Sequence, residues 1–340
     1  MKYDLLEKLS NAPGVSGNES AVREIIVKEI GPYVDDMRTD HLGNLIAFKK
    51  GTKRGRKKIM LAAHMDEVGL MISHTNEKGL LFFEKVGGID DRVLPAKRIL
   101  IGKDRIPGLI CIKPIHLTRR EEREKIIRHD AMMIDIGTAS REETEKLVKQ
   151  GDYAVFDTEF EVLGRVCKGK AFDDRAGCAV LIELLKSGPF PFDLCPVFTT
   201  MEEVGLRGAK VAAFAVKPDA AFVLEGTICD DGPKDTDTSS TTELGKGPAV
   251  SIMDHSIIAD KRLVQLLLTT AENEGIPCQI KQPGKGGTDA GAIHLSGTGI
   301  PSVPLAVPCR YIHSPVSIIS KQDFENTIRL MTGVLQKGTL

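Results

Sequence analysis

Beyond Gly164 the sequence alternates between segments with the apolar period of a helix and short apolar segments typical of strands. The expected helices span residues 174–186, 207–216, 260–274, 289–296 and 321–336, and the expected strands span 195–200, 219–224, 277–282 and 300–305. This alternation is typical of a central sheet with helices packed on both of its faces. We therefore predict an α/β fold with a central mixed sheet sandwiched by helices.

The first 68 residues add two helices and two strands to this pattern. Helices are expected over residues 2–11 and 18–30, and strands over 42–49 and 58–63. The segment from Lys58 to Ala63 is almost continuously apolar, which is typical of a strand buried on both faces of a sheet. The N-terminal segment is thus expected to share one domain with the segment beyond Gly164.

The residues between Gly69 and Leu163 have a different pattern of apolar residues. Short apolar runs, punctuated by glycine and proline, occupy residues 70–73, 80–86, 98–101, 109–112 and 132–136. This pattern predicts a small β-barrel-like domain. The simplest organisation is one α/β domain, formed by residues 1–68 and 164–340, with a β domain of residues 69–163 inserted in it.

The composition of the 340-residue chain excludes several classes of function. The net charge is −1, tryptophan is absent and basic residues do not interleave with aromatic ones, so we expect no nucleic-acid surface. The N-terminus lacks the apolar core of a signal peptide, and no apolar run approaches about 20 residues, so we expect no membrane association. The seven cysteines are scattered without a CxxC pair, which favours the reducing cytoplasm.

Acidic residues and histidines stand where expected strands end or expected helices begin. They are His64, Asp66 and Glu67, then Asp173 and Asp174, Glu202 and Glu203, Glu225, and His313. Each group taken alone is also typical of a loop turn, a helix N-cap or a hydrogen-bonded core histidine. Together they place candidate ligands on one rim of one sheet, where ligands bind in open α/β folds.

Several carboxylates gathered at one rim repel one another unless cations neutralise their charge. Two histidines with at least three carboxylates suit Zn²⁺, Co²⁺ or Mn²⁺, and a bridging carboxylate would let the set hold two ions. Two such ions about 3.5–4 Å apart form a known clamp for hydrolysis by a metal-activated water. The residues thus predict a hydrolytic centre with two divalent metal ions per subunit.

Five segments carry a resemblance to a known family, and they read HMDEVG, KAFDDRAG, TTMEEVGLRGA, GKGGTDAGAIH and RYIHSP. They resemble the di-metal aminopeptidases that include glutamyl, deblocking and tetrahedral (TET) aminopeptidases, some of which carry the label endoglucanase or cellulase. The resemblance runs along essentially the whole chain, in matching order. It implies a zinc-peptidase-like catalytic α/β domain and a metallo-aminopeptidase that removes N-terminal residues from short peptides.

The resemblance also implies the metal ligands, which would be His64, Asp173, Glu203, Glu225 and His313. His64 and Glu225 would hold one ion, while His313 and Glu203 would hold the other. Asp173 would bridge the two ions. It is chosen over Asp174 because relatives tolerate a non-acid at the second position. Many relatives have aspartate in place of Glu225, which leaves metal affinity and metal preference open.

The same resemblance assigns Glu202 as the general base, which takes a proton from the attacking water and returns one to the leaving amine. Asp66 would act on His64 through its second ring nitrogen. The substrate pocket would be lined by Gly286, Gly287, Thr288 and Asp289. A glycine turn followed by a helix N-cap explains these four residues equally well.

Members of the family assemble through the inserted domain into dimers and then tetrahedral dodecamers, which implies a homo-oligomer here. Two alternatives stay open. A glycosidase would use two carboxylates beside a sugar bond, but it would leave both histidines unused and would lack tryptophan as a sugar platform. A non-catalytic scaffold would keep the fold and assemble through the β domain, without needing Glu202 or the five ligands.

Overall fold

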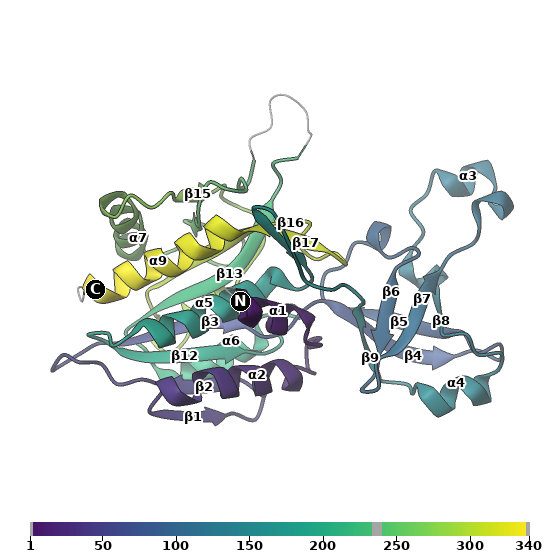
Figure 1. The fold of residues 1–340 in the computed structure, drawn as a ribbon, viewed down its shortest axis with the longest axis horizontal. Helices are drawn as coiled ribbons and strands as arrows, with labels where there is room; N and C mark the ends of the chain where they lie inside the picture. Colours follow the sequence, from purple (N-terminus) through teal and green to yellow (C-terminus); the bar gives the residue numbers. More distant parts are fainter. Residues whose placement is uncertain (1–2, 233–239, 338–340) are drawn as a thin grey trace.

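The computed structural model describes residues 3–232 and 240–337. Within these residues a large sheet covered by helices lies beside a closed β-barrel (Figure 1). This arrangement confirms the predicted α/β fold with an inserted barrel-like unit. None of the helices among the described residues combines the length and the apolar composition that a membrane-spanning helix needs.

The large sheet is mixed, because its centre is parallel and its flanks are antiparallel. Its strands follow the order β1 (Asp36–Thr39), β2 (Leu45–Phe48), β12 (Asp193–Thr199), β3 (Lys58–His64), β13 (Ala220–Cys229), β16 (Ser302–Arg310), β17 (Ser317–Ser320), β11 (Val166–Gly169) and β10 (Glu161–Leu163). β12, β3, β13 and β16 run parallel to one another. β14 (Ala249–Ser251) pairs with β16, and β15 (Gln279–Lys281) pairs with β14.

Helices cover both faces of this sheet. One face packs against α1 (Asp4–Asn11), α2 (Ser20–Ile30), α5 (Phe172–Ser187), α7 (Lys261–Asn273) and α9 (Lys321–Lys337), and the other against α6 (Arg207–Val216) and α8 (Ala290–Ile293). Strand β3 explains the layering, because Ile59 and Leu61 enter the first core while Met60 and Ala62 enter the second. A strand whose successive side chains are all buried requires cover on both sides.

The barrel has a hydrophobic core of its own. Its strands follow the order β4 (Gly69–Thr75), β5 (Leu81–Val86), β8 (Met133–Asp135), β7 (Ile106–Cys111), β6 (Arg98–Ile101) and β9 (Tyr153–Phe156). Pairing of Leu70 with Ala154 joins the first strand to the last and closes the barrel. Helices α3 (Arg120–Arg123) and α4 (Arg141–Leu147) lie in the connections outside these strands (Figure 1).

The predicted domain bounds, 1–68 with 164–340 for the α/β domain and 69–163 for the β domain, stay a prediction. The barrel strands fall between Gly69 and Phe156, inside the range 69–163. Strand β10 also falls in that range, yet it pairs with β11 of the large sheet. The last strand of the barrel, β9, thus ends at Phe156, and from Glu161 the chain belongs to the large sheet.

Candidate metal centre

Strand register brings His64 and Glu225 to the same height in the sheet. The last paired residues of β3 and β13 are Ala62 and Val223, and two residues further along each strand are His64 and Glu225. β12 ends beside His64, where Thr199 is its partner, and the chain then turns to carry Glu202 and Glu203 over the same rim. Parallel strands therefore deliver their carboxyl ends to one place.

Glu225 does not follow a strand, and the sequence-based expectation was wrong on this point. β13 continues beyond Glu225 to Cys229, because it pairs with β16 as far as Arg310. The neighbour on the other side, β3, stops at His64. Beyond Val223, therefore, β3 no longer pairs with this edge of β13, and the edge borders the site. Glu225 lies within β13, two residues past the last pair.

The five predicted ligands lie together, with Asp173 between two clusters. Asp173 Oδ1 is 3.2 Å from His64 Nε2, which is also 3.6 Å from Glu225 Oε2. Asp173 Oδ2 is 3.4 Å from His313 Nε2, which is 3.3 Å from Glu203 Oε2. The two oxygens of one carboxylate thus face two separate imidazole–carboxylate pairs, as a bridging ligand requires.

Both histidines are held in the tautomer that suits a metal ligand. His64 Nδ1 lies 3.0 Å from the backbone carbonyl of Asp66, and His313 Nδ1 lies 2.9 Å from that of Gly88. A carbonyl only accepts hydrogen bonds, so each Nδ1 carries a proton and Nε2 is the nitrogen that can coordinate a metal ion once it has lost its own proton.

The acceptor for His313 comes from the barrel. Gly87 and Gly88 follow β5, and a Cβ atom at Gly87 would lie 3.3 Å from Glu203 Cβ. This turn therefore packs against both residues of the His313–Glu203 pair. Sequence reasoning missed it, because nothing near Gly88 resembles a site motif.

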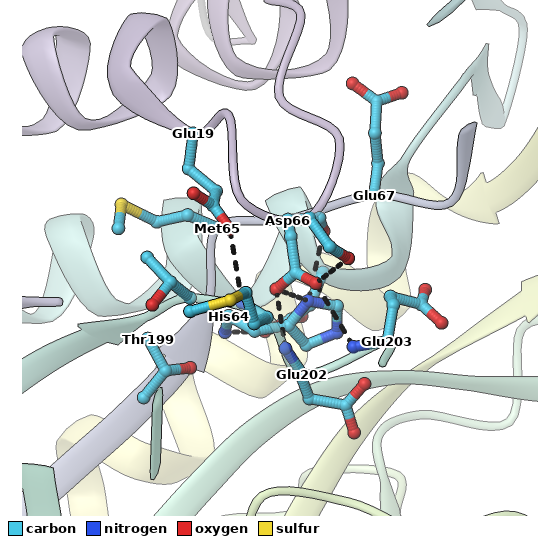
Figure 2. A network of polar contacts seen from close by, with 12 residues as sticks. Glu19, His64, Met65, Asp66, Glu67, Thr199, Glu202 and Glu203 are labelled. Carbon is cyan, nitrogen blue, oxygen red and sulfur yellow. Dashed lines mark hydrogen bonds and ion pairs between the residues drawn. The ribbon is translucent and has the colours of Figure 1, made fainter. Parts of the chain in front are cut away.

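Asp66 connects the two loops that build the rim. Figure 2 shows its carboxylate between the His64 ring and the backbone of Glu202 and Glu203, while the Glu67 side chain points away. Asp66 accepts hydrogen bonds from the N–H groups of Glu202 (3.0 Å) and Glu203 (3.1 Å). Its carboxylate also accepts from Ser16 Oγ at 2.6 Å. Asp66 therefore fixes the position of Glu202 and Glu203 relative to His64.

Asp174 has a different environment from Asp173. Its Oδ1 accepts the N–H of Gly177 (2.8 Å), and its Oδ2 accepts the N–H of His64 (3.1 Å). Oxygen atoms of Asp174 also come within 4.8 Å of candidate ligand atoms on His64 and Glu225. Because both of its oxygens already bind backbone N–H groups, we favour Asp173 as the shared ligand.

The charges at the rim fit a cation. Burial raises the pKa of Glu203 to about 7 and also raises the pKa values of Glu225 and Glu202, with neighbouring carboxylates adding to each shift. Buried carboxylates that resist ionisation indicate too little positive charge among the protein's own groups. The imidazoles of His64 and His313 with the carboxylates of Asp173, Glu203 and Glu225 form a donor set that suits a borderline divalent metal.

The rim opens into a cleft of about 330 Å³. Its lining includes Glu202, Lys281, Gly286, Gly287 and Thr288, besides the five predicted ligands. Asp289 is buried and does not line the cleft; its N–H donates to Glu225 Oε1 (3.3 Å), and its carboxylate accepts from Thr199. The structure thus brings the five predicted ligands, Glu202, Gly286, Gly287 and Thr288 to one cleft, whereas Asp66 and Asp289 are buried beside it.

Removal of metal is expected to make stability fall as pH rises. Burial raises the pKa of Glu203 from 4.5 to about 7. Between these pH values the unfolded chain has lost the proton while the folded chain keeps it, so the free energy of unfolding falls as pH rises. Burial lowers the pKa of His313, but Asp173 and Glu203 outweigh it and raise this pKa from 6.5 to about 9. Stability from the charged His313 is present below pH 6.5 and lost towards pH 9.

Melting temperatures of chelated and metal-loaded protein at pH 5 and pH 9 check this expectation. The chelated protein should melt at a lower temperature at pH 9 than at pH 5, and the loaded protein should lose less or gain, because metal binding tightens as ligands lose protons. Glu203→Gln in the chelated form should show a shallower fall. Equal slopes with and without metal would contradict the assignment.

Comparison with known proteins places the chain in a family. The family model described as M42 glutamyl aminopeptidase matches residues 43–330. The chain belongs to this family. It is therefore a metal-dependent aminopeptidase, a hydrolase that acts on peptide bonds.

Relatives and solved structures match over nearly the whole M42 chain. A putative aminopeptidase of Acetivibrio thermocellus is 41% identical, with 97% of each chain covered, and a lysyl aminopeptidase of Pyrococcus furiosus is 33% identical, with 98% and 97% covered. A TET aminopeptidase from a marine sediment thaumarchaeon is 39% identical, with a TM-score of 0.94 and coverage of 98% and 95%.

Two further structures bear on assembly and on the alternative function. The TET1 peptidase of Pyrococcus horikoshii, which assembles into a tetrahedron or a large octahedral shell, is 36% identical, with a TM-score of 0.86 and coverage of 98% and 99%. A Thermotoga maritima protein named an endoglucanase is 37% identical, with a TM-score of 0.82 and coverage of 98% and 97%. The family resemblance inferred from the five sequence motifs is thereby confirmed.

Proposed function

We propose that this M42 aminopeptidase binds two divalent metal ions and uses Glu202 as its general base. The observation that carries this proposal is the position of Asp173, whose two oxygens face His64 Nε2 and His313 Nε2 at 3.2 and 3.4 Å. Glu225 and Glu203 would complete the two sites. Bound Zn²⁺, Co²⁺ or Mn²⁺ would polarise the scissile carbonyl and lower the pKa of the attacking water.

The chain's own residues would supply orientation and proton transfer. Glu202 lines the cleft beside the candidate ligands, and its backbone is fixed by Asp66. Burial raises the pKa of its carboxyl, which favours uptake of a proton from the attacking water. The same carboxyl would then pass this proton to the leaving amine. Gly286, Gly287 and Thr288 would accommodate the N-terminal residue of the peptide.

The glycosidase alternative explains fewer features of the site. A glycosidase needs an acid and a base or nucleophile on either side of a sugar bond. It would not need two imidazoles whose Nδ1 protons are fixed by backbone carbonyls and whose Nε2 atoms meet at one carboxylate. The aminopeptidase function uses every one of these contacts.

Hydrolysis of aminoacyl-p-nitroanilides tests the proposed function. Protein stripped with a chelator should lose activity by more than about a hundredfold, since the metal supplies both carbonyl polarisation and water activation. Refilling with Zn²⁺, Co²⁺ or Mn²⁺ in turn should restore activity and identify the most effective ion. Activity that ignores the chelator, together with hydrolysis of β-glucan, would support the glycosidase instead.

We also propose a cytoplasmic homo-oligomer that assembles from dimers into a dodecamer through the barrel. Support comes from the TET structures and from exposed apolar side chains along one part of the barrel chain, namely Leu109, Ile112, Ile115, Leu117 and Ile126. The seven unpaired cysteines favour a reducing compartment. Light scattering on metal-loaded protein tests the assembly, and a monomer at every concentration would refute it.

A further inference from the structure

Three charged side chains are buried together beside the candidate metal centre. They are Glu67, Lys170 and Arg175, each at most 3% exposed. Lys170 Nζ lies 2.7 Å from both carboxylate oxygens of Glu67, and Arg175 donates to one of these oxygens at 3.1 Å. Because burying a charge is costly, and either cation alone would balance Glu67, the presence of both points to a role beyond charge balance.

The two cations flank the turn that carries Asp173. Lys170 precedes this turn and Arg175 follows it, so the single carboxylate of Glu67 holds both of its ends. Within the turn, Ala171 has a φ of 55°, in the left-handed region that residues other than glycine rarely adopt. A strained residue of this kind persists only where its surroundings fix it. The pairing of both cations with Glu67 supplies such a constraint.

Glu67 belongs to the loop that follows His64. Strand β3 ends at His64, and Glu67 lies three residues further along. Figure 2 shows its side chain directed away from the His64 ring, so it faces the buried cations rather than the cluster of ligands. The N–H of Gly14 also donates to Glu67 Oε1, at 3.1 Å. Glu67 therefore ties the loop that carries His64 to the turn that carries Asp173.

A small cavity shows how close this ion pair lies to the candidate ligands. Glu67 and Lys170 line a space of about 20 Å³, and the same space is lined by Asp173, Glu203 and His313. A cavity of this size has room for about one water molecule. The ion pair and three of the five ligands therefore border one water-sized space, and a displaced Lys170 side chain would disturb the ligands directly.

We infer that Lys170 is a positioning residue, which keeps Asp173 between the two histidines by anchoring the turn before α5 on Glu67. This inference rests on the proposed two-metal site. Arg175 holds the far end of the turn, and Lys170 holds the near end, three residues before the shared ligand. Because Asp173 offers one oxygen to each ion, a small displacement of this turn would weaken both sites.

The variant Lys170→Met tests the inference, because it removes the charge, keeps an unbranched side chain and leaves Arg175 to balance Glu67. Titration of the stripped protein with Zn²⁺ against a competing chelator should show an affinity lower by about 10- to 100-fold, the usual effect of losing a contact that orients a ligand. Since all five ligands remain, kcat should recover as the Zn²⁺ concentration is raised. Lys170→Arg should regain most of the affinity, because a guanidinium can donate to both oxygens of Glu67.

The matched control is Lys49→Met, since Lys49 anchors the other end of α5. Its Nζ donates to the carbonyl of Leu185, in the last turn of that helix, at 2.6 Å. Both variants should lower the melting temperature of the stripped protein, because each leaves an acceptor without its donor. Only Lys170→Met should also lower the affinity for Zn²⁺. An equal loss of affinity in both variants would indicate general loosening of α5 and would overturn the inference.

The wild-type protein, titrated in parallel, separates this inference from the proposed function. It should bind two Zn²⁺ ions per chain and regain activity on loading. If the wild type binds two ions and Lys170→Met binds them equally tightly, the inference on Lys170 is wrong while the proposed function stands. A wild type that binds fewer than two ions, or that stays inactive with every metal, would instead refute the proposed function.

Discussion

Replacement of Glu202 by glutamine is expected to lower kcat by about 10²- to 10⁴-fold, the usual contribution of a general base. Glutamine keeps the size of the side chain, and the backbone N–H of residue 202 can still donate to Asp66. The carboxylate is not one of the five candidate ligands, so metal content should stay unchanged. Steady-state kinetics with elemental analysis of the purified variant measure both quantities.

The neighbouring variant Glu203→Gln is the matched control. It makes the same chemical change one residue away, but at the carboxylate that lies 3.3 Å from His313 Nε2. It should therefore lose metal as well as activity. If Glu202→Gln also lost metal, or kept its full rate, the general-base assignment would be wrong.

Replacement of Asp173 by asparagine should have the largest effect on metal content. Both oxygens of Asp173 face imidazole nitrogens, and an amide offers only one oxygen and no negative charge. Since loss of a supporting contact alone weakens metal affinity by about 10- to 100-fold, loss of a shared ligand should cost at least about a hundredfold and leave little activity at micromolar metal. Titration of the stripped protein with Zn²⁺ measures the affinity.

Asp174→Asn separates the two adjacent acids. Asp174 accepts N–H groups of Gly177 and His64, so the amide loses one acceptor and the protein should be destabilised by about 1–3 kcal/mol. Its metal content should stay close to that of the wild type. The opposite pattern, with metal lost from Asp174→Asn and kept by Asp173→Asn, would assign the shared ligand to Asp174.

Local sequence pattern was sufficient for elements whose packing is set by their own residues. The helix over 207–216 was predicted with the bounds that α6 has, because its alanines recur with the period that buries them against the second core. Strand β3 was predicted to within one residue for the same reason. In contrast, the length of β13 depends on its pairing with β16, some 80 residues further along the chain, and no local signal marks that extension.

The residues of the candidate site also fall into two groups, those marked by a local motif and those brought in by tertiary structure. Motifs around His64, Asp173 and His313 are local, so the sequence alone suggested these candidate ligands. The carbonyl of Gly88 and the ammonium of Lys281 reach the site through tertiary structure, from the barrel and from β15. A glycine pair after a strand and a lysine in a short strand are ordinary sequence features. Only the fold shows what they face.

The hydrogen bond between Gly88 and His313 gives the inserted barrel a part in the candidate metal centre. An α/β part excised without the barrel would retain all five candidate ligands, yet one imidazole would lose the acceptor that keeps a proton on Nδ1. Barrels exchanged between relatives would therefore be compatible only where the turn after β5 is preserved. The turn of Gly87 and Gly88 thus belongs to the candidate metal centre although the barrel carries it, so substitutions there are expected to change metal binding.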